Sequence, residues 1–273
     1  MGHAAHRLVI DNYRESNIAM HRKVLTVAFL LALATSVREA SAQVGDPWTD
    51  RGYFNLNIAF GGGDGSFEDA GTFRLYGEDG ALAVSTIYDA GALFDFAVGA
   101  RVWRNVSLGI GFHYGGSSND GSVTASVPHP VVFGNHRAVA FGVNDLDRSE
   151  RAFHLQFGYM YPVNEELSVH VTLGPSFFSV HQDVISEVAF TEVGPPFTAV
   201  NSSPVITERS DSPVGFNIGV DATYKLYETP TMKLGAGFFL RWAGSTAEFQ
   251  VLDSVVETDV GGVQVGFGGR LRF

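Results

Sequence analysis

Strict alternation of apolar and polar residues through eight segments constrains the fold of this chain more than any other feature. In residues 53–60, the even positions are apolar and two Asn residues stand between them. Successive side chains of a β-strand point to opposite faces, whereas a helix repeats every three to four residues. We therefore expect an all-β fold whose main strands are 53–60, 93–103, 106–114, 151–161, 167–180, 214–226, 232–242 and 263–273.

The connections between these segments alternate between short and long. Short links follow residues 103, 161 and 226, whereas long polar segments cover 61–92, 115–150, 181–213 and 243–262. Outer-membrane barrels have strands of about ten residues, short periplasmic turns and long extracellular loops. The pattern predicts an eight-stranded antiparallel up-and-down transmembrane β-barrel with both chain ends at the periplasmic side.

The same alternation would suit a soluble, lipocalin-like barrel that turns its apolar faces inward. Three features favour the membrane-spanning alternative: charges and many Gly residues on the polar faces, aromatic residues at the ends of the apolar faces, and an aromatic last residue. Aromatic girdles mark both membrane interfaces of such barrels. The expected girdle residues are Tyr114, Tyr159, Tyr161, Tyr224 and Trp242.

The first 42 residues have the parts of an export signal. A basic stretch, 21–23, precedes an apolar run at 24–34 that is too short for a membrane-spanning helix. Ala40 and Ala42 form an A-x-A cleavage motif, so Gln43 is the expected mature N-terminus. Because Met20 directly precedes the basic stretch, we expect a non-native upstream extension at 1–19, a signal peptide at 20–42 and the barrel domain at 43–273.

Composition excludes several other classes of protein. The chain has no Cys, which removes disulfides and thiolate metal sites. Residues 1–42 hold five basic and three acidic residues, so their removal leaves 13 basic and 26 acidic residues. Nucleic-acid binding needs basic patches, and this acidic balance argues against it.

The polar strand faces place charged residues in the predicted lumen. We expect a lumen charge network of Asp95, Arg101, Asp221, Lys225, Lys233, Arg241, Arg270 and Arg272. Buried like charges are unfavourable unless they are paired or hydrated. The network is expected to be a hydrogen-bonded plug, because eight strands enclose little more than their own side chains. The alternative is a narrow pore with a weak preference for anions.

Two histidines and one acidic loop could bind ligands. His113 and His154 face inward on neighbouring strands, where they could share a metal ion or sense pH. Without a third ligand at a suitable spacing, we interpret them as polar lumen residues. The Gly-rich loop 61–69 offers oxygen ligands for Ca²⁺ but lacks the EF-hand spacing, so we expect a solvated loop and no metal or other cofactor.

The last strand carries a residue pattern that resembles the terminal signal of bacterial outer-membrane barrels. Its residues are Val265, Phe267, Leu271 and Phe273. In those barrels this signal ends in Phe and is read by the barrel-assembly machinery. Residues 43–273 as a whole look like the small outer-membrane β-barrel superfamily, with barrels of the outer membrane protein A, W and X type.

The resemblance implies a bacterial outer-membrane location, contacts with lipid and lipopolysaccharide, and a monomer. Some small barrels modify lipid A, but here Ser168 and His170 lie near the periplasmic turns and form no convincing catalytic set. We expect a non-enzymatic barrel with a structural or surface-interaction role. The alternative is a narrow passive channel for small solutes or hydrophobic compounds, with 131–133 and Phe197 lining an access path.

Overall fold

The computed structural model describes residues 48–273 apart from Asp64 and Asp253. The predicted upstream extension, signal peptide and cleavage site lie outside the described residues. The described part folds into these strands: β1 (Gly52–Gly62), β2 (Gly65–Leu75), β3 (Glu78–Tyr88), β4 (Gly91–Trp103), β5 (Val106–Pro128), β6 (His136–Pro162), β7 (Leu167–Glu192), β8 (Val200–Asp211), β9 (Val214–Glu228), β10 (Lys233–Val251) and β11 (Ser254–Arg272). Within these residues, no helix has the length and hydropathy needed to cross a membrane.

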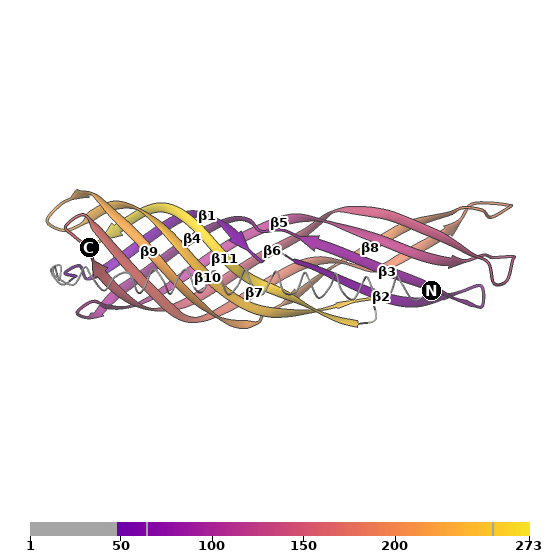
Figure 1. Cartoon of the computed structure of the whole chain (residues 1–273), viewed down its shortest axis with the longest axis horizontal. Helices are drawn as coiled ribbons and strands as arrows, with labels where there is room; N and C mark the ends of the chain where they lie inside the picture. The colour runs from indigo at the N-terminus through magenta and orange to yellow at the C-terminus, as the bar shows by residue number, and fades with distance from the viewer. Residues whose placement is uncertain (1–47, 64, 253) are drawn as a thin grey trace, which may run out of the picture. The chain divides into compact units, whose positions relative to one another are not determined.

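Eight of the strands close into a barrel (Figure 1). Their order around the barrel is β1, β4, β5, β6, β7, β9, β10 and β11, and every neighbouring pair is antiparallel. The ring is completed where β11 pairs with β1, from Tyr53 opposite Arg272 to Gly62 opposite Val263. The predicted eight-stranded barrel is therefore confirmed.

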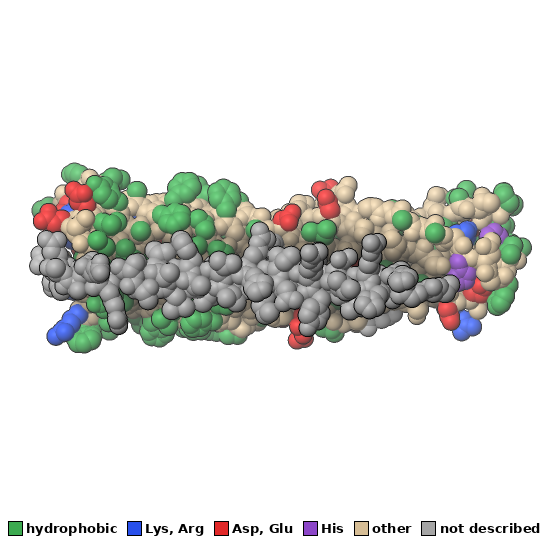
Figure 2. Space-filling model, viewed as in Figure 1, with side chains coloured by type: hydrophobic (Ala, Val, Ile, Leu, Met, Phe, Trp, Pro, Cys, Tyr) green, Lys and Arg blue, Asp and Glu red, His purple; other side chains and the backbone are tan. Residues whose placement is uncertain are grey.

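The apolar strand faces turn outward. Phe54 and Phe60 on β1 are 37% and 61% exposed, whereas Asn55 and Asn57 between them are 5% and 3% exposed. Figure 2 shows hydrophobic side chains gathered over the barrel strands. The soluble alternative requires the opposite arrangement, so it is wrong for this chain.

Inward glycines make room for large polar side chains in the narrow lumen. A Cβ atom at Gly99 or Gly109 would collide with the Tyr53 ring, and one at Gly237 would collide with the Arg270 guanidinium. An eight-stranded barrel has just enough interior to be filled by side chains. The alternation of Gly with Tyr and Arg on the inner faces therefore fits bulky groups into a barrel of this size.

The long connections contain more β-structure than the sequence analysis predicts. Segment 61–92 folds mainly as the β2–β3 hairpin, and 181–213 mainly as the end of β7 with β8. β5 and β6 remain paired as far as Pro128 and His136, and β10 and β11 as far as Val251 and Ser254. Together these parts form an extension of the barrel at the end opposite Phe273 (Figure 1). The extension lies beyond the part of the barrel with an apolar outer face, which we call the membrane belt.

The extension has an apolar core of its own. Its buried residues come from β2, β3, β5, β6, β7 and β10, and they are Phe67, Leu82, Val84, Tyr88, Val123, Ala125, Val127, Val143, Leu146, Val184, Ile185, Val188 and Val251. The interior of the chain is therefore polar within the membrane belt and apolar in the extension. Tyr76 and Gly77, both with positive φ (56° and 84°), form the tight β2–β3 turn at the far end.

Leu146→Ala tests whether the extension is a packed unit. Leu146 is 1% exposed in the extension core, so its truncation should destabilise the extension by about 2–5 kcal/mol. Hydrogen exchange measured by mass spectrometry should accelerate in the extension parts of β5 and β6, while the membrane parts of the same strands stay protected. Val255→Ala, at a residue that is 63% exposed, is the matched control. Unchanged exchange in the extension of Leu146→Ala would contradict a packed core.

Candidate functional site

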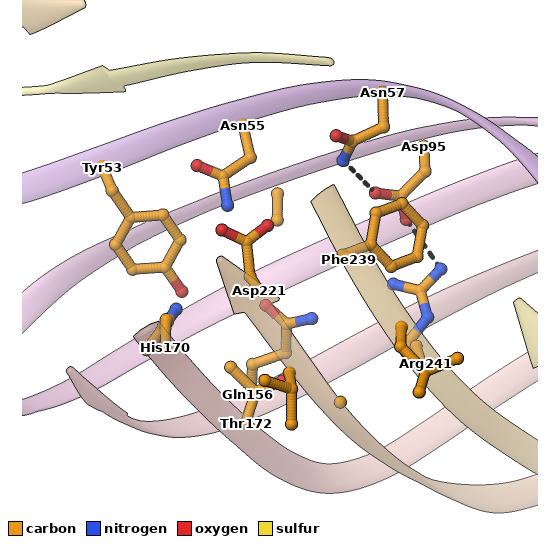
Figure 3. Close-up of a pocket in the computed structure, with 14 residues that line it drawn as sticks. Tyr53, Asn55, Asn57, Asp95, Gln156, His170, Thr172, Asp221, Phe239 and Arg241 are labelled. Atoms are coloured by element: carbon orange, nitrogen blue, oxygen red, sulfur yellow. Dashed lines mark hydrogen bonds and ion pairs between the residues drawn. The ribbon is translucent and has the colours of Figure 1, made fainter. Parts of the chain in front are cut away.

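One charge network in the lumen is centred on Arg241 of β10. Its guanidinium donates to Asp95 on β4 at 2.7 Å and to Gln264 on β11 at 2.6 and 2.8 Å. The amide of Asn57 donates to the other Asp95 oxygen at 2.7 Å. The Arg241 and Asp95 side chains are each only 4% exposed. The buried arginine is thus neutralised by a carboxylate on β4, which β1 and β11 separate from β10 (Figure 3).

A second network lies nearer the chain ends and is centred on Arg270 of β11. Its guanidinium donates to both carboxylate oxygens of Asp221, at 2.6 and 3.1 Å. It also donates to the Asn57 oxygen at 2.6 Å. Asn57 therefore joins the two networks, since its amide serves Asp95 and its oxygen serves Arg270. Arg272 donates to Thr223 at 2.9 Å and completes this layer.

A small cavity lies between these side chains. Its volume is about 30 Å³, which is room for about two water molecules. Figure 3 shows polar side chains from several strands pointing into it, including Asn55, Gln156 and Asp221. A cavity of this size is far below the 300–1,000 Å³ of typical small-molecule sites.

The two predicted lumen histidines contact each other. His113 Nδ1 lies 3.0 Å from His154 Nε2, and the far nitrogens reach Glu150 at 3.2 Å and Ser176 at 2.7 Å. Glu150 and Ser176 were not among the predicted lumen residues. Glu150 stands at an inward position of the same alternation, four residues before His154, but the predicted strand began one residue too late to include it.

These side chains follow one another in the order of a serine nucleophile and its base. They are, however, not accessible to a substrate. Ser176, His113 and His154 are each 0% exposed. A nucleophilic serine must reach a substrate as well as its base. Among the described residues, no three His, Cys, Asp or Glu side chains are placed to share a metal ion.

The remaining predicted charges lie close to the periplasmic rim. Lys225 and Lys233 are not enclosed in the lumen, because their side chains are 26% and 28% exposed. Lys233 pairs with Asp50 at 2.8 Å. Arg101 donates to the backbone carbonyl of Trp48 at 2.7 Å. Residues 48–51, directly before β1, therefore fold against this end of the barrel and supply acceptors for its cations.

The terminal-strand residues face away from the lumen. Val265, Phe267 and Phe273 are 38%, 61% and 50% exposed. The backbone of Phe273 exchanges hydrogen bonds with Gly52, at 2.8 and 3.1 Å. The last strand is thus held in the ring to its final residue.

Comparisons with known proteins give similarity of fold only. No protein-family model and no curated protein matches the chain. Solved structures that resemble it include Neisserial surface protein A (12% identity, TM-score 0.40, covering 81% of this chain and 97% of that one). Others are the outer membrane protein OprG from Pseudomonas aeruginosa (11%, 0.41, 82% and 97%) and Ail of Yersinia pestis (12%, 0.33, 81% and 99%).

The chain has the architecture of the small bacterial outer-membrane β-barrels. Its ring of eight antiparallel strands is closed, its outer face is apolar and its inner face is polar. Closed barrels satisfy every backbone group internally, so they can cross the hydrocarbon core of a membrane. These properties suit the barrel to a membrane rather than to water.

Arg270→Ala tests the role of the lumen pairs in stability. The substitution leaves the Asp221 carboxylate without its bidentate partner, and breaking a buried pair in this way costs about 3–5 kcal/mol. Urea titration in lipid vesicles should show a large loss of stability. The double variant Arg270→Met with Asp221→Asn should recover part of it, and Arg104→Ala, at an exposed turn, should change little. Equal stability of Arg270→Ala and Arg104→Ala would rule out a stabilising network.

Proposed function

We propose that the protein is a non-conducting, non-enzymatic outer-membrane barrel that holds a rigid β-extension outside the cell as an interaction surface. The closed interior is the observation that carries this proposal. From the periplasmic rim outward, the lumen contains Trp48, the Arg270 layer, the Arg241 layer and the histidine pair. An apolar layer that includes Phe178 and Phe249 follows, and beyond it comes the core of the extension.

A passive channel requires a continuous path, and the packed interior opposes one. The polar layers enclose a cavity of about 30 Å³, and Val84, Val123 and Val184 in the extension core are at most 2% exposed. Hydrated ions are not stabilised among buried valines. The apolar core also leaves no path for a hydrophobic solute, since its residues already contact one another.

The extension is built to present a surface. Three of its hairpins are linked at the far end. There Arg137 of β6 bonds to Glu192 of β7, and Tyr76 of the β2–β3 turn bonds to the same carboxylate. A packed core and cross-links between hairpins keep such a surface in one conformation, which lowers the entropy lost on binding. The membrane-spanning barrel would serve as its anchor.

The proposal includes a monomer embedded in lipid and lipopolysaccharide. Every barrel strand of the described part already has two paired neighbours, so the ring offers no free edge for a second copy. During biogenesis, we expect the assembly machinery to read Val265, Phe267, Leu271 and Phe273, whose strand closes the ring.

Single-channel recording in planar bilayers tests the closed lumen. The wild-type barrel should give no stable conductance steps, and Arg270→Ala or Lys233→Ala should lower thermal stability more than they alter conductance. Arg104→Ala removes the same charge from an exposed turn and is the matched control. A large change of conductance in Arg270→Ala or Lys233→Ala, with unchanged melting, would favour a channel.

A further inference from the structure

The far end of the extension brings three turns together. They are the β2–β3 turn at Tyr76, the β5–β6 turn at 129–135 and the β7–β8 turn at 193–199. Two nitrogens of Arg137 donate to the carboxylate of Glu192, at 2.5 and 2.7 Å. Another of its bonds reaches the Phe197 carbonyl at 3.2 Å, and the Tyr76 hydroxyl donates to Glu192 at 3.0 Å. We call this group of turns the apex.

The central turn of the apex exposes three consecutive apolar residues. Val131, Val132 and Phe133 are 71%, 50% and 85% exposed. The neighbouring turns add Tyr76 and Val193, which are 47% and 43% exposed. Figure 2 shows hydrophobic side chains at this end of the extension, far from those over the barrel. Clustered exposed apolar residues mark interaction sites more often than single ones, and the protein's own bilayer does not reach this end.

Hydrogen bonds fix the exposed residues in place. The backbone N–H groups of Val131 and Val132 donate to His129 Nδ1, at 3.2 and 3.1 Å. The N–H of Gly134 donates to the Glu78 carboxylate at 3.1 Å, and its positive φ of 75° suits glycine. The turn therefore holds Phe133 outward as part of its structure.

Polar side chains beside the turn are held in contacts with one another. Arg137 pairs with Glu192, and His136 Nε2 lies 3.2 Å from Glu78. The Arg137 guanidinium holds the pKa of the Glu192 carboxyl below its usual range, so this pair is formed at neutral pH and is lost only as acid protonates the carboxyl. The turn from Pro130 to Gly134 carries no charge of its own. The exposed residues of this turn therefore suit an apolar, uncharged partner.

The charged residues around the apex limit which partners can bind there. Around the apex, the charged residues are Glu78, Asp79 and Glu192 against Arg74 and Arg137, so acidic residues are in slight excess. A second copy of this chain, or an anionic lipid surface, would meet that charge with like charge. A specific protein partner buries about 800 Å² on each side, more than a few projecting turn residues supply. A bilayer accepts projecting apolar side chains without a matching pocket.

We infer that the apex docks onto a neutral phospholipid bilayer of a facing membrane, with Phe133 as its most deeply inserted residue. The inference rests on the proposed function, because it needs the extension to project from the outer membrane as an interaction surface. Val131 and Val132 insert beside Phe133, and Tyr76 lies at the interface, where its ring meets the apolar layer and its hydroxyl keeps its bond to Glu192.

Flotation with phosphatidylcholine vesicles tests the inference on the full mature chain held in nanodiscs. The wild-type protein should float with the vesicles. Phe133→Ser should weaken this binding at least about tenfold, because burying a Phe side chain is worth more than one decade of affinity. Val255→Ser, at another exposed hairpin tip, is the matched control and should bind as the wild type does. Circular dichroism of both variants should match the wild type.

A second readout follows insertion directly. The chain has no Cys, so Phe133→Cys can carry the only environment-sensitive fluorophore, whose emission should shift to the blue when vesicles are added. Wild-type protein that stays unbound, or equal binding by Phe133→Ser, would overturn the inference. Nanodiscs that pair through Phe133 in sedimentation, without binding vesicles, would assign the apex to a second copy and overturn it too. If the barrel gives no conductance in planar bilayers and does not bind vesicles, only the docking inference is wrong. If the barrel conducts, the proposed function is wrong.

Discussion

Backbone hydrogen bonding inside hydrocarbon is the constraint on which the rest of this structure depends. An unpaired N–H or C=O group in the membrane costs several kcal/mol, so a sheet can cross it only as a closed ring. The pairing of β1 with β11, from Tyr53 opposite Arg272 to Gly62 opposite Val263, supplies that closure. Once eight strands are closed, the lumen has a fixed and narrow width. The side chains that fill the lumen must therefore have a suitable size as well as a suitable polarity.

The interior changes character along the barrel. Within the membrane belt, buried arginines are neutralised by Asp95 and Asp221, and Asn57 connects the two pairs. Beyond the belt, buried valines and leucines form the core of the extension. The polarity of the outer face changes in the opposite sense, since lipid surrounds the barrel and water surrounds the extension. The distribution of polar and apolar side chains is thus reversed between the closed barrel and the extension, and this change marks where the membrane ends.

Period-two alternation predicted the barrel because the outer and inner faces of each strand meet very different surroundings. It also placed Asp95, Asp221, Arg241 and Arg270 on the inner face, where the structure has them buried. Their partners were not predictable, because the contact of Asn57 with both Asp95 and Arg270 depends on the register and width of the ring. The extension was expected to consist of polar loops. In β3, for example, outward Ala81 and Ala83 stand beside the buried Leu82 and Val84, so the sequence shows little contrast between the two faces. Its hairpins are recognisable only when these residues are seen to share one core.

The central claim is that the apolar strand faces contact lipid. It is tested most directly by SDS gel migration of residues 43–273 refolded in detergent, with and without boiling, alongside far-UV circular dichroism. We predict a compact unboiled band that shifts on boiling, together with a β-rich spectrum. A protein that stays soluble without detergent and shows no shift would contradict the account, because its apolar faces would then have to point inward.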